Sequence, residues 1–304
     1  MDIDRLLELA SLAIDVGDDD LAIKTLTVLL AQAPDHPAAL WQIARYYGLK
    51  GAYTEAAEQY RLAVGRDPAL SLATFRVGEH TITLRDIPGS TMPALVLEEF
   101  GRGMYGLQQR RFSAGDVVLD IGAHIGAVSI LIAKRHPQVR VIAYEPSSSN
   151  YAMLVANLAA NDVHNVVAVR EAVAGVAGTL ELVWSPTETA AATANLDAGG
   201  RQRMVDAGWC RETVPCVTLD DIFALHAIER CAFLKLDCEG AEWDIVRRAS
   251  AIERVDAMAL ELHVPETRRG EGAGALQQEF AALLMNRPRY PEAVVSSTVW
   301  VRQA

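Results

Sequence analysis

The chain has 304 residues, with 28 lysines and arginines against 39 aspartates and glutamates, which gives a formal net charge of -11 at pH 7. Proteins that bind the phosphate backbone of nucleic acids need clustered positive charge, so this acidic chain is not expected to have a nucleic-acid partner. The first residues are acidic where a signal peptide is basic, and the longest apolar run, residues 117–133, is interrupted by Asp120 and His124. A cytoplasmic protein without a membrane partner is therefore expected.

Residues 1–70 are rich in alanine and leucine and contain two similar units, each closed by a proline. Pro34 and Pro68 lie 34 residues apart, and small residues recur at matching places before them, with Ala22 corresponding to Ala56. Small residues let two antiparallel helices approach closely, and a proline ends a helix. This pattern resembles the tetratricopeptide repeat (TPR), which implies a small all-α domain.

Two repeats are fewer than such domains usually need for independent stability. The helices are therefore expected to pack on the rest of the chain or on another subunit. A structural cap or a homodimer arm is favoured over a groove for a protein partner. Residues 71–112 are expected to connect this domain to the next, with a strand or hairpin over 75–84 and a helix over 93–112.

From residue 113 to residue 304, short apolar strands alternate with single helices, which predicts a parallel sheet covered on both faces. Strands are expected at 117–121, 139–144, 166–170, 179–184, 231–237 and 257–263. Helices are expected at 127–135, 149–161, 219–226, 241–247 and 275–284. Residues 185–213 break the alternation and are expected to form a lid or a mobile loop.

The first strand of this series ends in Asp120 and leads into a turn that contains Gly122 and Gly126. Ligands of open α/β sheets bind beyond the carboxyl ends of the strands, and glycines let backbone approach a ligand closely. The glycine spacing does not match the dinucleotide fingerprint, which favours a cofactor without a diphosphate over NAD. Glu145, which ends the next strand, could accept both hydroxyls of a ribose.

The later strands also end in polar residues. Glu171 and Ala172 follow the third strand, at a place suited to adenine contacts, and Asp237 and Glu239 follow the strand at 231–237. The motifs LDIGAHIG, AYEP, TLDD, LKLDCEGAE and LELH occur in this order along the chain. Their combination resembles the FkbM family of S-adenosylmethionine-dependent methyltransferases over about residues 75–304.

The resemblance implies a class I methyltransferase fold, which is Rossmann-like with a seven-stranded sheet. Residues 298–301 are a candidate for its last, antiparallel strand. It also implies S-adenosylmethionine as the cofactor, with the methionine end near Asp120 and the ribose on Glu145. His124 stands where asparagine is usual, so its contact is less defined. Cofactor contacts are expected from Asp120, Gly122, Ala123, His124, Gly126, Glu145, Pro146, Glu171, Ala172 and Asp237.

Methyl transfer to a hydroxyl requires a group that removes a proton. The catalytic candidates at the last two strand ends are His263, Asp237, Glu239 and Glu261. Histidine is the natural base near neutral pH, and Asp237 or Glu239 could orient it. The same groups could instead bind a divalent metal, an alternative that is not favoured, or Glu261 and His263 could form a structural pair.

Glu242 and Asp221 are expected to cap helices. Four cysteines without C-x-x-C spacing are expected to be reduced and not to bind zinc. Together these features predict an S-adenosylmethionine-dependent methyltransferase that acts on a hydroxyl of a small molecule, natural product or glycan. Two alternatives remain open: a protein or peptide methyltransferase that recruits its substrate through the repeats, and a non-catalytic TPR interaction protein.

Overall fold

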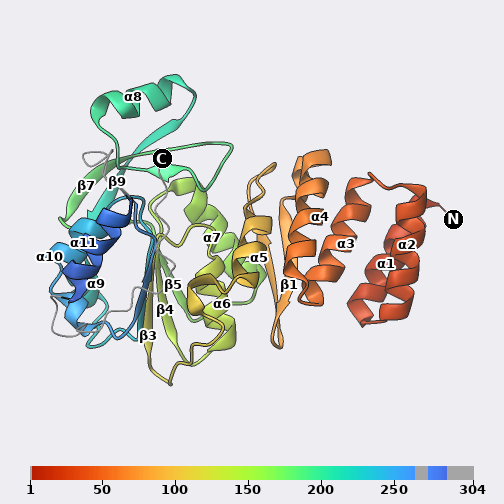
Figure 1. Ribbon diagram of the computed structural model, residues 1–304, viewed down its shortest axis with the longest axis horizontal. Helices are drawn as coiled ribbons and strands as arrows, with labels where there is room; N and C mark the ends of the chain where they lie inside the picture. The colour runs from red at the N-terminus through yellow and green to blue at the C-terminus, as the bar shows by residue number, and fades with distance from the viewer. Residues whose placement is uncertain (1, 264–272, 286–304) are drawn as a thin grey trace. The chain divides into compact units, whose positions relative to one another are not determined.

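The computed structural model describes residues 2–263 and 273–285. The chain forms two compact units, Met1–Gln108 and Gln109–Ala304. The first consists of helices and one hairpin, and the second contains two β-sheets with helices (Figure 1). Within the described residues, no helix combines the length and the apolar character that crossing a membrane would require.

Four helices fill the two predicted repeats of the first unit. They are α1 (Ile3–Val16), α2 (Asp19–Gln32), α3 (Pro37–Leu49) and α4 (Tyr53–Arg66). Helix α1 packs against α2 and α3 packs against α4 (Figure 1). The small residues expected between the helices are fully buried: Ala10, Ala22, Ala44 and Ala56. The predicted helices are thus present, whereas their membership of the tetratricopeptide repeat family stays a prediction.

The segment expected to connect the two domains, residues 71–112, lies largely in the first unit. Its elements, with the short helix before it, are η1 (Pro68–Leu70), β1 (Leu72–Val77), β2 (His80–Arg85), α5 (Met92–Gly101) and η2 (Met104–Gly106). Strands β1 and β2 form an antiparallel hairpin, as predicted, and β1 packs against α3. A Cβ on Gly48 would meet the Thr74 carbonyl oxygen at 2.6 Å, so this contact is close.

The helix predicted over 93–112 is wrong in its second half. Helix α5 ends at Gly101, because Gly103 adopts φ +91° and Tyr105 adopts φ +49°, both outside helical geometry. Only the short turn η2 follows it. The positive φ angles of Gly103, Tyr105 and Gly106 therefore prevent the helix from continuing.

The main sheet of the second unit has five described strands in the order β11-β10-β3-β4-β5, and all four pairings are parallel. The strands are β3 (Val117–Ile121), β4 (Arg140–Tyr144), β5 (Val166–Val169), β10 (Phe233–Leu236) and β11 (Met258–Leu260). The predicted parallel sheet is confirmed. Its expected seven strands are not, and residues 298–301, the candidate last strand, lie outside the described residues.

Helices cover both faces of this sheet. They are α6 (Ala127–Arg135), α7 (Ser148–Ala160), α9 (Leu219–Leu225), α10 (Glu242–Arg248), η3 (Ala251–Arg254) and α11 (Ala273–Met285). Side chains of α9, α10 and α11 share one apolar core with Leu119 and Ile121 of β3. Helices α6 and α7 lie on the other side (Figure 1). The core thus fixes the strand ends at which the candidate site lies.

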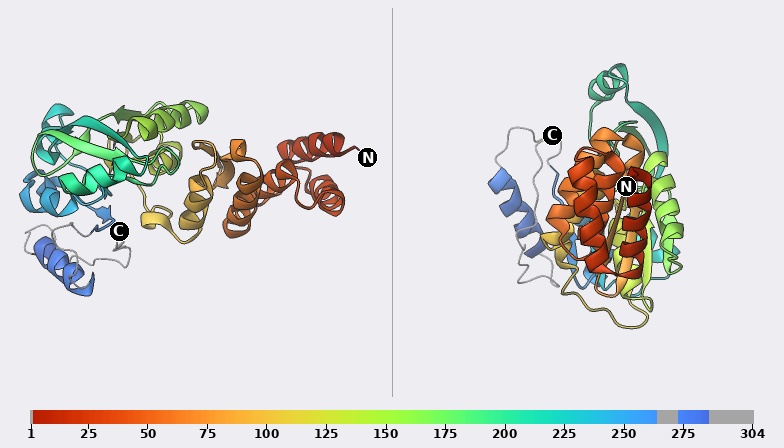
Figure 2. Two further views of the ribbon diagram at one scale, coloured as in Figure 1. Left: turned by 90° about the horizontal axis from the view of Figure 1, so that it is seen from above. Right: turned by 90° about the vertical axis from the view of Figure 1, so that its right-hand side faces the viewer.

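A second, four-stranded sheet has the order β6-β9-β7-β8. Its elements are β6 (Ala172–Val173), β7 (Gly178–Trp184), β8 (Ala192–Thr193) and β9 (Cys210–Val217), with α8 (Ala198–Asp206) between the last two. The strand predicted over 179–184 exists, but it pairs antiparallel with β9 and does not join the main sheet. Residues 185–213, expected as a lid or loop, hold β8, α8 and part of β9, and α8 stands off at the end of this sheet (Figures 1 and 2).

Candidate functional site

The predicted site residues gather at one edge of the main sheet. Strands β4, β3, β10 and β11 are consecutive neighbours there, and their carboxyl ends point the same way because they are parallel. Glu145 follows β4, Asp120 lies near the end of β3, Asp237 follows β10, and Glu261 and His263 follow β11. This edge is where α/β sheets bind ligands.

Lys235 was not among the predicted site residues, yet it pairs with two of the predicted acids. It is opposite Asp120 in the β3–β10 register, and its Nζ lies 3.6 Å from Asp120 Oδ1 and 3.1 Å from Asp237 Oδ2. Burial opposes the lysine charge, but Asp237 and Asp120 outweigh it and raise the pKa of Lys235. A lysine inside the apolar strand sequence FLKL was the available signal, because a buried charge needs a partner.

Asp120 is fully buried at the centre of this network. Its Oδ2 accepts a hydrogen bond from Ser129 Oγ at 2.6 Å. Its Oδ1 has no hydrogen-bond partner within the described part of the chain and faces Lys235. Asp120 therefore has a structural role in joining β3, α6 and β10, in addition to the cofactor contact predicted for it.

The glycines of the turn after β3 have a packing reason that the sequence did not predict. Gly122 adopts φ +75°, and a Cβ on it would lie 1.7 Å from the Asp237 carbonyl oxygen. Gly126 adopts φ +91°, and a Cβ there would lie 2.6 Å from a methyl carbon of Leu154. Gly122 thus needs glycine because of a backbone contact inside the protein, and Gly126 needs it mainly for its positive φ, whatever ligand lies near the turn. His124 between them also has a positive φ, +53°.

Glu145 is buried and holds the same turn in place. Its Oε2 accepts from the His124 backbone N–H at 2.9 Å, and its Oε1 accepts from the Ser147 N–H at 3.0 Å, directly after Pro146. The Asn150 side chain is a third hydrogen-bond partner of this carboxylate. Burial raises the pKa of Glu145 from 4.5 to about 7, although these hydrogen bonds and Lys235 act in the opposite direction.

The raised pKa of Glu145 predicts how stability changes with pH. Between pH 4.5 and about 7 the folded chain binds more protons than the unfolded chain, so this group lowers the free energy of unfolding as pH rises. In Glu145→Gln that contribution is absent. The variant should therefore gain stability relative to the wild type between pH 5 and pH 8, as measured by denaturant unfolding. An equal difference at both pH values would contradict the raised pKa.

Glu171 and Ala172, which follow β5, have different surroundings. Ala172 is buried in β6, where it pairs with Cys216 of β9. Glu171 is half-buried, and its charge adds to burial in raising the pKa of Tyr144 to about 12. The predicted adenine contact by these two residues stays a prediction.

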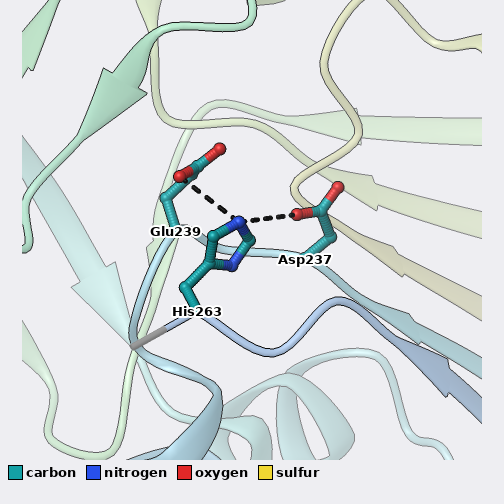
Figure 3. A group of neighbouring side chains, drawn as sticks. All are labelled: Asp237, Glu239 and His263. Carbon is teal, nitrogen blue, oxygen red and sulfur yellow. Dashed lines mark ion pairs between the residues drawn. The ribbon is translucent and has the colours of Figure 1, made fainter. Parts of the chain in front are cut away.

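Asp237, Glu239 and His263 form a close group, which we call the acid–histidine cluster (Figure 3). His263 Nε2 lies 3.4 Å from Glu239 Oε2 and 4.0 Å from Asp237 Oδ1. Burial opposes the charge on His263, but Glu242, Glu239 and Asp237 outweigh it and raise its pKa to about 9. Burial and the neighbouring acids raise the pKa of Glu239 to about 7, against the effect of His263. Of the four predicted catalytic residues, Glu261 is outside this cluster.

Glu242 has a different role from the helix cap expected of it. It is fully buried at the start of α10, and its carboxylate accepts from the backbone N–H groups of Cys238 and Gly240 at 2.8 and 3.0 Å. Its Oε1 also lies 3.0 Å from His263 Nδ1. Glu242, and not Asp237 or Glu239, therefore orients the imidazole. Asp221, by contrast, does cap α9, through a capping box with Thr218.

The segment 185–213 contacts the loop that carries Glu239. Thr193 Oγ1 donates to the Glu239 carbonyl oxygen at 3.4 Å. A Cβ on Gly240 would lie 2.5 Å from the Asn195 side chain, so the segment 185–213 leaves room only for glycine at position 240. The segment thus forms an ordered wall beside the cluster.

The fold and the site together define a doubly wound α/β protein whose polar groups lie at the carboxyl edge of the parallel sheet. The chain belongs to the methyltransferase FkbM domain family, whose sequence profile matches residues 120–286. Methyltransferase sdnD of Sordaria araneosa is 28% identical over 152 residues, which cover 43% of this chain and 59% of that protein. The 31-O-demethyl-FK506 methyltransferase FkbM of Streptomyces tacrolimicus is 27% identical over 186 residues, 54% of this chain and 71% of that one.

Solved structures are more distant. The N-terminal domain of human METTL16 in complex with SAH covers 84% of this chain and 84% of its own at 12% identity, with a TM-score of 0.35. A likeness at this level supports no argument about the fold or the ligand. Family membership therefore rests on the sequence match.

Proposed function

We propose that this chain is an S-adenosylmethionine-dependent methyltransferase that methylates a hydroxyl of a small molecule, natural product or sugar. The family match supports methyl transfer, and one relative is named for a 31-O-demethyl substrate, which supports an oxygen acceptor. The observation that carries the proposal is the position of Glu145 and the acid–histidine cluster at one edge of the same sheet.

The residues at this edge fit the cofactor. Glu145 is a buried carboxylate at the end of β4, the strand end at which an acid binds ribose hydroxyls in nucleotide-binding α/β folds, which supports the proposed ribose contact. Asp120 and Asp237 supply negative charge near the end where a cationic methionine group would lie, with Lys235 balancing part of it. When bound, S-adenosylmethionine would supply a methyl group on a sulfonium, which leaves a neutral thioether after transfer.

The chain's own part in the reaction is to orient the acceptor and take up its proton. For a hydroxyl acceptor, the residues of the chain would have to hold the oxygen in line with the methyl group and take up the hydroxyl proton. In the acid–histidine cluster, the pKa of His263 is raised to about 9 and that of Glu239 to about 7, so Glu239 would be the group that takes up this proton near neutral pH. Thr193 and Asn195 lie beside the loop that carries Glu239 and would border an acceptor bound there.

Binding of S-adenosylhomocysteine, followed by calorimetry, tests the cofactor assignment directly. The expected result is one site per chain, and the absence of binding would overturn the proposal. His263→Ala should leave that affinity unchanged within a few-fold, because His263 contacts Glu239 and Glu242 and not Glu145, and should lower turnover of a hydroxyl acceptor by at least about 100-fold. Unchanged turnover would remove the cluster from the reaction.

A further inference from the structure

We propose that Asp237, Glu239 and His263 bind a divalent cation of the Mn²⁺ or Zn²⁺ type. The inference concerns binding by these three side chains and stands on their geometry. Only the use of the ion in catalysis rests on the proposed function. Three side chains from two adjacent strand ends would hold it, and the remaining positions would be open.

The distances within the cluster suit one ion. Its three ligand atoms all lie within 4.8 Å of one another, with Nε2 3.4 Å from Glu239 Oε2 and 4.0 Å from Asp237 Oδ1. Ligands at about 2.1 Å from an octahedral ion are about 3 Å apart when adjacent and about 4.2 Å apart when opposite. Small side-chain rotations therefore bring all three atoms onto one ion.

His263 is oriented as a metal ligand is. Its side chain is 7% exposed, its Nδ1 lies 3.0 Å from Glu242 Oε1, and its Nε2 points toward the two other carboxylates (Figure 3). Its Nε2 faces the carboxylates of Glu239 and Asp237 at ion-pair distances of 3.4 and 4.0 Å, which are longer than a strong charge-assisted hydrogen bond. A carboxylate behind the far nitrogen fixes the tautomer that leaves Nε2 free to coordinate.

The backbone of the loop that carries Glu239 fixes the position of this side chain in the cluster. Glu239 adopts φ +55°, which is unfavourable for a residue with a side chain, and Gly240 follows with φ +117°. The carboxylate of Glu242 fixes this turn through two backbone N–H groups. Glu242 thus holds two of the three ligands, the imidazole directly and Glu239 through the loop.

Charge and access are also suitable. Two carboxylates balance a divalent ion, and a set of two oxygens and one imidazole nitrogen favours Mn²⁺ or Zn²⁺ over Ca²⁺, which prefers oxygen ligands throughout. The Glu239 side chain is 38% exposed and that of Asp237 is 23% exposed, so an ion can reach the cluster from solvent. An acceptor hydroxyl in an open position would lose its proton more readily, and that proton would pass to solvent because the three side chains are then occupied by the ion, which is the consequence for the proposed function.

The competing explanation is an imidazolium ion paired with three carboxylates and no metal. Titration of the full-length chain with Mn²⁺ after treatment with EDTA separates the two. We expect one Mn²⁺ per chain, with spin-echo modulation from a histidine nitrogen. His263→Ala should abolish the nitrogen signal, and Glu239→Gln, whose side chain is partly exposed and so tolerates substitution, should weaken binding by at least about ten-fold. His164→Ala should change nothing, because His164 pairs with Asp162 on the surface at 2.8 Å.

The proposal is overturned if neither Mn²⁺ nor Zn²⁺ binds at millimolar concentration, or if Glu239→Gln and His263→Ala bind as the wild type does. Binding of S-adenosylhomocysteine in EDTA is measured on the same samples. If that binding persists while no metal binds, the metal site is wrong and the methyltransferase proposal stands. If metal binds and the cofactor analogue does not, the reverse holds.

Discussion

Lys235→Met should lower the free energy of unfolding of the second unit by about 3–5 kcal/mol, as measured by denaturant titration. The ammonium lies between Asp120 and Asp237, and the side chains of Lys235 and Asp120 are 4% and 0% exposed. Methionine fits the space but leaves the Asp120 carboxylate buried without a counter-charge. An unpaired buried charge costs far more than a surface pair contributes.

The double variant Lys235→Met/Asp120→Asn is the informative control. It removes both charges, so it should recover more than half of the lost stability. Arg203→Met, on the exposed surface of α8, should stay within about 0.5 kcal/mol of the wild type. A small effect of Lys235→Met alone, or no recovery in the double variant, would contradict the idea that Lys235 compensates the Asp120 charge.

Glu145→Gln should weaken binding of S-adenosylhomocysteine by about 10- to 100-fold, because an amide loses one acceptor oxygen and the charge that strengthens the other, about 1.5–3 kcal/mol. The affinity of the wild type should also rise with pH. Since the pKa of Glu145 is about 7 in the free chain, the carboxylate that accepts ribose hydroxyls forms as pH passes that value. Calorimetry from one pH unit below to one above it measures both effects.

Glu181→Gln is the matched control for this variant, because Glu181 on β7 is partly exposed and pairs with Arg201. Its affinity and pH dependence should equal those of the wild type. If the pH dependence survives in Glu145→Gln, another group causes it. If Glu145→Gln binds S-adenosylhomocysteine as tightly as the wild type does, Glu145 does not bind the ribose. The cofactor would then bind through other residues at this edge of the sheet.

Local patterns predicted those elements of the fold whose signal lies within one segment. Strand β3 and helix α6 have the predicted bounds, because a largely apolar run and the glycine turn within it mark both. Pairing of distant segments was not predictable in this way. The alternation at 179–184 shows that the chain is extended there, but only tertiary contact shows that β7 pairs with β9 instead of joining the main sheet.

The same limit applies to the candidate site. Strand-end acids identified Asp237 and Glu145, because position after an apolar strand is a local signal. From the sequence, Glu242 could be recognised only as an acid in the first turn of a helix. Its contact with His263 joins residues 21 positions apart, which no local pattern predicts. Likewise, Gly122 could be recognised as a position where another group approaches the backbone closely. The group that does so, the Asp237 carbonyl, follows another strand and was not predictable.

The β1–β2 hairpin of the first unit determines where the chain can be divided into soluble fragments. A cut after residue 70 follows the end of the repeats, yet it would strip β1 from α3 and expose Phe75, which is 2% exposed and packs against Tyr53 and Phe100. An uncovered apolar strand invites edge-to-edge association. Fragments that begin at residue 71 should therefore aggregate, whereas a cut after Gln108 keeps the hairpin with the helices that cover it.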